Sequence, residues 1–182
     1  MNKKYQRLCA YIKSDYVRYG GKVGILHFLR MYMVNHCFAF SFWLRCCQER
    51  MFFYPVAKIM RRRYMKKHGL QIPPEAKIGY GLYLGHGIGV IINKNVIIGN
   101  NCNLSQFVSI GTNNGRGAII GDNVYIGPSV CIVESINIGD NVTIGAGAVV
   151  VKDVPPNATV AGVPAKVLNY NNPGRYIKNR WI

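Results

Sequence analysis

The chain has 182 residues, of which 49% are apolar, and a formal net charge of +16. This length allows one domain with a smaller extension, and the apolar content allows that domain to bury a core. Residues 1–70 hold 15 Lys or Arg against two acidic residues, so a basic extension precedes a nearly neutral region. Such an extension suits nucleic acid, an anionic membrane face or an acidic polymer.

The cysteines and the N-terminus exclude several classes of protein. Six cysteines lack CxxC spacing and the density of a disulfide scaffold, so we expect reduced thiols. The N-terminus has no apolar stretch long enough for a signal peptide, and the longest uncharged run within residues 1–70, residues 31–44, is too short to span a bilayer as a helix. We therefore expect a cytoplasmic protein, whose basic extension would also suit work at the inner membrane face.

Residues 1–70 are predicted to form an α-helical cap. The pattern indicates three helices, over residues 3–19, 22–35 and 38–67. Gly20 and Gly21 end the first helix, a break is expected near Asn35, and Pro55 is expected to kink the last helix. Because this segment is rich in aromatic residues of the kind that cores bury, a folded cap is favoured over an arm that binds nucleic acid.

Residues 71–168 carry an internal repeat with a period of six. Aliphatic residues keep this interval at Ile92, Ile98, Leu104 and Ile110, and again at Ile120, Ile126, Ile132, Ile138, Ile144 and Val150. This period fits neither a single amphipathic helix nor a lone strand, but it fits a chain wound into a triangular prism with one flat side per six residues. Each aliphatic residue is expected to point inward, and the neighbouring Gly or Asn is expected to take a corner with positive φ.

The repeat slips out of phase at three places. Eight residues separate Leu84 from Ile92, ten separate Ile110 from Ile120, and ten separate Val150 from Val160. The second slip predicts a loop within residues 112–118, and such loops on a rigid scaffold often carry function. Residues 169–182 form a basic tail that is expected to add a short capping element.

Several stretches of the repeat resemble a known family. They are residues 72–79 (IPPEAKIG), 81–87 (GLYLGHG), 103–111 (NLSQFVSIG), 120–127 (IGDNVYIG), 152–155 (KDVP) and 161–167 (AGVPAKV). These stretches resemble the left-handed β-helix hexapeptide-repeat acyltransferases of the serine acetyltransferase-like branch. The residues after His86, 90–96 (VIINKNV), also resemble the colanic-acid and capsule type of exopolysaccharide O-acetyltransferase. The resemblance implies a mainly β fold, a left-handed parallel β-helix with a helical cap.

The resemblance implies acetyl transfer from acetyl-CoA to a hydroxyl group, a reaction that needs a general base. His86 is the only histidine of the repeat domain, and a neutral imidazole suits this role. Asp15 is a second candidate that would approach from the cap, although a solvated carboxylate on a helix surface is the favoured interpretation. Gln106, Asn113 and Arg116 are the predicted acceptor-binding residues.

Two departures from serine acetyltransferases bear on the acceptor. Gly85 stands where those enzymes carry Asp before the histidine, and the loop of residues 112–118 lacks their second histidine. Because burying the ammonium of serine without a facing carboxylate is costly, a sugar hydroxyl of a surface polysaccharide or its lipid-linked precursor is favoured over L-serine. L-Serine remains the alternative acceptor.

The cofactor-binding residues follow from the same resemblance. In this fold the pantetheine arm lies in a groove between neighbouring subunits, where small residues let it approach the backbone. The predicted residues are Gly127, Gly145, Ala146, Lys152 and Lys166. A homotrimer that shares each site between two chains is expected, and pairing of trimers through the cap stays open.

Two other functions compete with the transferase. A zinc hydratase on the same prism needs three histidines, and the repeat offers one, so no metal is expected. A non-catalytic scaffold with a basic arm would release no thiol from acetyl-CoA.

Overall fold

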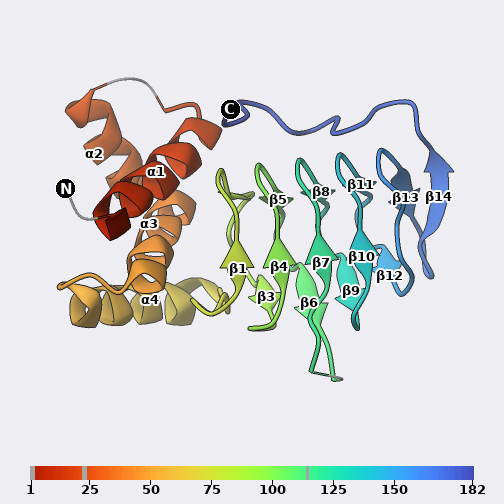
Figure 1. Cartoon of the computed structure of the whole chain (residues 1–182), viewed down its shortest axis with the longest axis horizontal. Helices are drawn as coiled ribbons and strands as arrows, with labels where there is room; N and C mark the ends of the chain where they lie inside the picture. Colours follow the sequence, from red (N-terminus) through yellow and green to blue (C-terminus); the bar gives the residue numbers. More distant parts are fainter. Residues whose placement is uncertain (1–2, 22–23, 114) are drawn as a thin grey trace.

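The computed structural model of the protein describes residues 3–21, 24–113 and 115–182, and it consists of a helical cap joined end to end with a β-helix (Figure 1). The cap holds four helices: α1 (Lys3–Arg18), α2 (Ile25–Val34), α3 (His36–Glu49) and α4 (Tyr54–His68). The prediction of one helix over residues 38–67 is wrong. The helix α3 ends at Glu49, because the next residue, Arg50, takes a left-handed φ of 48°. Pro55 therefore lies in the first turn of α4, where its missing N–H has no cost.

The predicted break near Asn35 is confirmed. The N–H of Asn35 donates to the carbonyl of Met31 (2.9 Å), and its side-chain oxygen accepts from the N–H of Phe38 (3.0 Å). One asparagine thus ends α2 and caps α3, which is a favoured use of this residue type. The predicted start of the second helix at residue 22 lies outside the described residues.

The remainder winds into a left-handed parallel β-helix of about four turns. Three parallel sheets form its sides. The β1 sheet holds β1 (Lys77–Ile78), β4 (Ile97–Ile98), β7 (Ile119–Ile120) and β10 (Asn137–Ile138). The β2 sheet holds β2 (Tyr83–Leu84), β5 (Asn103–Leu104), β8 (Tyr125–Ile126), β11 (Thr143–Ile144), β13 (Thr159–Ala161) and the antiparallel β14 (Lys166–Asn169). The β3 sheet holds β3 (Ile91–Ile92), β6 (Ser109–Gly111), β9 (Cys131–Val133) and β12 (Val149–Val150).

The aliphatic residues of the repeat fill the interior, as predicted. Each of the ten that keep the interval of six is at most 4% exposed, from Ile92 to Val150. They stack in register from turn to turn, for example Leu104 beside Ile126 and Ile126 beside Ile144. The period of six therefore buries one continuous core, and burial of apolar area is the dominant stabilising term of this domain.

The corners use asparagine as predicted, but the reason given for glycine is wrong. Asn101, Asn123, Asn141 and Asn157 have φ between 55° and 65°, whereas the glycines that follow the core isoleucines do not have positive φ. Most of those glycines lack room for a side chain instead, although an added Cβ on Gly111 would have nothing within 4 Å. A Cβ on Gly99, for example, would lie 2.6 Å from the carbonyl oxygen of Gly121.

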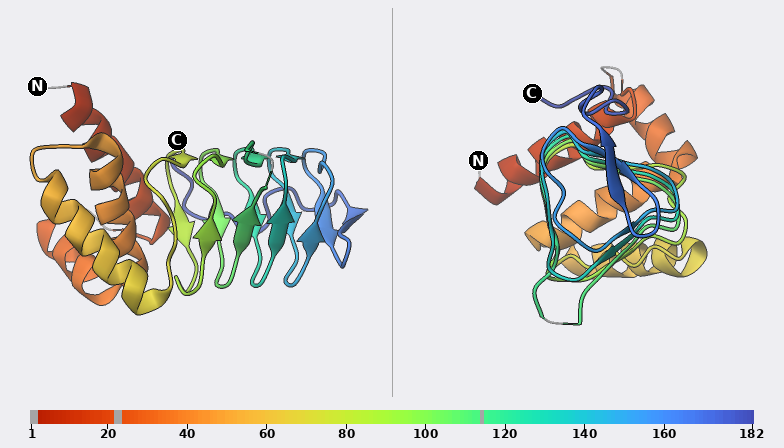
Figure 2. Two further views of the ribbon diagram at one scale, coloured as in Figure 1. Left: turned by 90° about the horizontal axis from the view of Figure 1, so that it is seen from below. Right: turned by 90° about the vertical axis from the view of Figure 1, so that its right-hand side faces the viewer.

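Three edges join the three sheets, and each has a distinct character. The His86 edge (residues 85–90, 105–108, 127–130 and 145–148) links the β2 and β3 sheets. The loop edge (residues 93–96, 112–118, 134–136 and 151–153) links the β3 and β1 sheets, and the predicted loop projects from it (Figure 2, right). The strap edge, which includes Asn101, Asn123 and Asn141, links the β1 and β2 sheets.

The winding ends earlier than predicted. Val160 is the last buried residue of the repeat, and Val167 is 42% exposed because β14 turns back antiparallel to β13. The C-terminal strap (residues 170–182) then returns along the strap edge to the cap (Figure 1). Its Gly174 N–H donates to Asn141 O (2.7 Å), and its Trp181 N–H donates to Asn101 Oδ1 (2.8 Å). The tail therefore does more than the short capping element that was expected.

No helix among the described residues has both the length and the apolarity needed to cross a membrane.

Candidate active site

His86 lies in an exposed turn between β2 and β3, at the first phase slip of the repeat. Its φ of 63° is uncommon for a residue with a side chain and costs about 1 kcal/mol or more. The cap holds this turn from two helices. His36 Nε2 at the start of α3 lies 3.3 Å from the carbonyl oxygen of His86, and the N–H of Gly89 donates to His68 O at the end of α4 (3.0 Å).

The wall of the cap beside this turn is tightly packed. The rings of His36 and His68 stack with centroids 4.3 Å apart, and a Cβ on Gly87 would lie 2.5 Å from Cys37 Sγ. Burial is the main cause that lowers the pKa of His68, and the nearby His36 and Lys67 lower it further. Burial raises the pKa of Cys37 to about 11. The wall therefore favours neutral groups, and it fixes the backbone from which the His86 side chain projects.

The structure places four of the predicted site residues on the same edge as His86, on the turns that follow it along the β-helix. Backbone hydrogen bonds stack the successive turns of the His86 edge, from Phe107 N to Ile88 O (2.9 Å), from Ser129 N to Gln106 O (3.0 Å) and from Gly147 N to Pro128 O (2.8 Å). Gln106, Gly127, Gly145 and Ala146 lie on this edge. At Gly127 an added Cβ would lie 2.9 Å from the nitrogen of Ala146, so glycine allows successive turns to stack closely at this edge, while Ala146 is exposed on its surface.

Gln106 has an unsatisfied group beside the His86 turn. Its Oε1 is buried and accepts no hydrogen bond from the described residues. An unpaired buried acceptor costs about 1–3 kcal/mol, so a ligand that donates a hydrogen bond there would be stabilised. This observation supports the predicted contact between Gln106 and the acceptor.

Phe107 belongs to the same site and was missed in the sequence. It is 57% exposed at a φ of 59°, and its ring lies over Gly89, where an added Cβ would be 2.6 Å from Cδ1. The sequence did hold a signal for it: Phe107 is aromatic, whereas the equivalent corners of later turns carry the small residues Ser129 and Gly147. An exposed aromatic ring next to His86 offers a flat apolar surface to a ligand.

The other predicted binding residues lie elsewhere in the chain. Asn113, Arg116 and Lys152 are exposed on the loop edge, so the whole width of the β3 sheet separates them from His86. Lys166 is exposed on β14, opposite Ala161 and beyond the last turn of the His86 edge. Within one chain, the structure does not bring the loop residues to the histidine.

Asp15 is buried, so the expectation of a solvated surface carboxylate is wrong. Its two oxygens accept hydrogen bonds from Arg45 (2.9 and 3.0 Å), from the N–H of Leu82 (2.8 Å) and from the hydroxyl of Ser41. Arg45 in turn donates to the carbonyl of Ile78 (2.7 Å). This ion pair joins α1 and α3 to the first turn of the β-helix, and no oxygen of Asp15 is directed to His86.

The fold and this edge define a β-helical protein of the hexapeptide-repeat type. The family model described as "Bacterial transferase hexapeptide (six repeats)" matches residues 117–152. A serine acetyltransferase of Staphylococcus aureus is 41% identical over 104 residues, and one of Synechococcus elongatus is 36% identical over 104 residues. Each alignment covers 55% of this chain, but only 49% and 43% of the respective relative. The chain thus spans less than half the length of these curated relatives.

Solved structures cover more of the chain. The crystal structure of Neisseria gonorrhoeae serine acetyltransferase in complex with serine superposes with a TM-score of 0.71 at 32% identity, over 90% of this chain and 68% of that one. The soybean serine acetyltransferase apoenzyme gives a TM-score of 0.75 at 29% identity, over 88% of this chain and 69% of that one. The chain belongs to the left-handed β-helix hexapeptide-repeat acyltransferase family. The comparisons place it beside serine acetyltransferases, and they give no support to the exopolysaccharide branch.

Proposed function

We propose that this protein is an acetyl-CoA-dependent O-acetyltransferase with His86 as the general base. The observation that carries the proposal is the exposed His86 at the head of an edge lined by Gly127, Gly145 and Ala146. An imidazole can take a proton near neutral pH, and the small side chain of the exposed Ala146 leaves this part of the edge open to an extended ligand. The names of the relatives support the same reaction class.

In the proposed reaction, His86 removes the proton from the acceptor hydroxyl as its oxygen attacks the thioester carbonyl. The tetrahedral intermediate carries its negative charge on the former carbonyl oxygen, which needs hydrogen-bond donors. Its collapse breaks the carbon–sulfur bond, and the proton held by His86 passes to the leaving thiolate. The contacts that fix the backbone of the His86 turn restrict the base before the substrate binds, so less entropy is lost on reaching the transition state.

L-Serine is the acceptor that the relatives favour, since those compared are named serine acetyltransferases. One observation favours a neutral acceptor such as a sugar hydroxyl. Gly85, next to the base, provides no carboxylate for an ammonium group, and Asp15 is committed to Arg45. We therefore carry the sugar hydroxyl as the second candidate.

We also propose that the active enzyme is a homotrimer with sites between chains. The strap edge is covered by the chain's own tail, so the His86 edge and the loop edge remain for contacts with neighbours. Exposed apolar residues mark the free surfaces, among them Phe107 and Ile88 on the His86 edge and Val151 on the loop edge. A neighbour's loop would carry Asn113, Arg116 and Lys152 toward His86, which explains why one chain leaves them apart.

The test measures thiol release from acetyl-CoA with L-serine and with neutral sugars as acceptors. His86→Ala should lower kcat by at least about 100-fold while the far-ultraviolet circular dichroism spectrum and the trimer mass stay unchanged. Unchanged turnover in this variant would refute the assignment of the base. No thiol release with any acceptor would favour the scaffold.

A second variant separates the acceptors. A Cβ on Gly85 would meet its nearest atoms at 3.7 Å, so Gly85→Asp should fold normally. If the natural acceptor is neutral, this variant should lower activity on the sugar and raise activity on L-serine, because the new carboxylate faces the ammonium. If the wild type already prefers L-serine and Gly85→Asp does not improve it, the sugar acceptor is refuted.

A further inference from the structure

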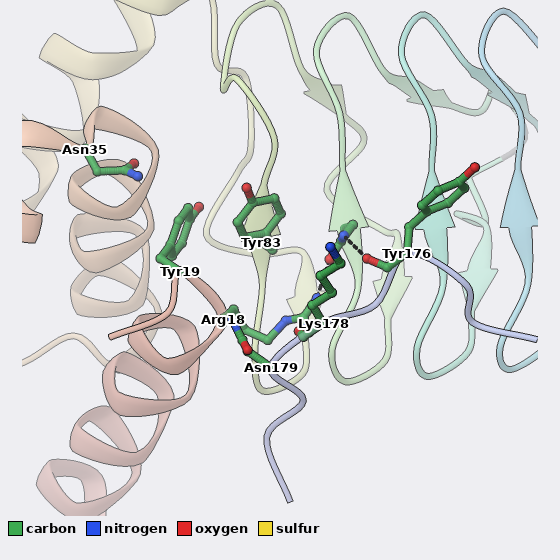
Figure 3. Close-up of a pocket in the computed structure, with 8 residues that line it drawn as sticks. Arg18, Tyr19, Asn35, Tyr83, Tyr176, Lys178 and Asn179 are labelled. Carbon is green, nitrogen blue, oxygen red and sulfur yellow. Dashed lines mark hydrogen bonds between the residues drawn. The ribbon is translucent and has the colours of Figure 1, made fainter. Parts of the chain in front are cut away.

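A cavity of about 320 Å³ lies where the cap, the β2 sheet and the C-terminal strap meet (Figure 3). It is lined by Arg18, Tyr19, Asn35, Tyr83, Asn103, Tyr176, Lys178 and Asn179. The volume is within the range of small-molecule sites. No acidic residue is among the lining groups, which are two cations, three phenols and three amides.

Arg18 is the unusual member of this set. It is only 4% exposed, and its three hydrogen bonds go to neutral acceptors: the carbonyl of Gly81 (3.2 Å), the carbonyl of Lys178 and the side-chain oxygen of Asn103. A guanidinium has five N–H groups, so two of them have no acceptor among the described residues. Burial is the main cause that lowers the pKa of Arg18, and the nearby Arg180 lowers it too.

The cap holds a second buried arginine, Arg45, whose charge is paired with a carboxylate. Arg45 is 0% exposed, and its charge is matched by Asp15 at 2.9 Å. Buried charges in proteins are normally paired in this way. An unpaired ion in a low-dielectric site loses its hydration free energy, and no opposite charge offsets that loss. Arg18 has no such carboxylate among the described residues, although it borders an open cavity.

The neighbouring groups extend the positive potential and add recognition. Lys178 presents a second cation from the strap, and it too has no carboxylate partner in the part of the chain that the structure describes. The Tyr19 and Tyr83 rings lie 4.7 Å apart on the cap side of the cavity. Phenols and amides can bind hydroxyl groups, and aromatic faces can pack on a small ring.

We propose that this cavity is a binding site for a polar small molecule that carries a carboxylate or phosphate group, with Arg18 and Lys178 as its cationic contacts. The anion would supply the charge that Arg18 lacks, and the tyrosines and asparagines would contact the rest of the molecule. This site does not depend on the proposed acetyl transfer, since it is defined by binding alone.

The test is titration calorimetry in a chloride-free buffer of low ionic strength with D-glucuronate, inorganic phosphate and D-glucose as ligands. We expect one saturable site per chain for glucuronate or phosphate and no binding of glucose. Lys178→Gln should weaken the binding roughly two- to fivefold, as for an exposed charge, and Arg18→Gln should weaken it about tenfold or more. The matched control is Arg175→Gln, which removes the same charge from the strap outside the cavity lining.

Two results would overturn the proposal. One is the absence of saturable binding of either anion to the wild type. The other is equal weakening in Lys178→Gln and Arg175→Gln, which would reduce the effect to the overall charge of the protein. Because Arg18→Gln removes three hydrogen bonds and can unfold the cap, the comparison of Lys178 with Arg175 decides the matter if that variant does not fold.

Discussion

Replacement of Asp15 by asparagine should unfold the cap at a much lower temperature without removing the catalytic base. Asp15 is 0% exposed and accepts two hydrogen bonds from the fully buried Arg45. The amide of asparagine keeps the size but leaves the guanidinium charge unpaired. Loss of one partner of a buried ion pair costs about 3–5 kcal/mol, and in a chain of this length each kcal/mol lowers Tm by about 2–4 °C. We therefore expect a drop in Tm of roughly 6–20 °C.

The assay is thermal unfolding followed by circular dichroism at 222 nm, where the cap helices dominate the signal. The double variant Asp15→Leu with Arg45→Met should recover part of the lost stability, because it removes the unpaired buried charge but leaves the Leu82 N–H and the Ile78 carbonyl without their partners. Acetyl transfer by Asp15→Asn, measured well below its Tm, should stay within about twofold of wild type. A stable Asp15→Asn variant that has lost its activity would refute this reasoning and return Asp15 to the catalytic residues.

Two further predictions concern the β-helix and the pH range of the protein. Gly99→Ala should lower the free energy of unfolding by about 2 kcal/mol or more in urea titrations, because its Cβ would lie 2.6 Å from Gly121 O, whereas Gly111→Ala should be nearly neutral, since nothing lies within 4 Å. Burial raises the pKa of Cys102 from 9.0 to about 12, so the folded chain keeps a proton that the unfolded chain loses, and stability should fall between pH 9 and 12. Cys102→Ala should remove up to about 1.4 kcal/mol per pH unit of that slope; an unchanged slope would contradict the assignment.

The sequence was sufficient to predict the β-helix because its signal is repeated. Each turn places an aliphatic residue every six positions, and a period kept from Ile92 to Ile110 and again from Ile120 to Val150 leaves few alternatives. The break at Asn35 was also predictable, since asparagine both tolerates a helix end and caps the next helix. The break at Arg50 was not, because a left-handed arginine has no local signature and depends on how α3 and α4 pack together.

The contacts within the site depend on tertiary structure, which explains the misses. A lone carboxylate on a helix is usually solvated, and only the docking of α3 against the first turn gives Asp15 its partner Arg45. The sequence also did not show which residues share an edge of the prism. The period of six predicts which residues lie on the flat sides, but it does not predict which other turns an extruded loop approaches. Phe107 was not predicted because a large aromatic residue is normally expected in a core, whereas this ring is exposed at a corner.

The returning C-terminal strap changes how this repeat domain can come apart. In a linear stack each coil touches only its two neighbours, so the array can fray from its free end one coil at a time. Here the strap crosses every coil and its Trp181 is fastened to Asn101, near the opposite end. The outermost coil cannot peel away unless this fastening opens too, so the solenoid and its cap should melt as a single cooperative unit.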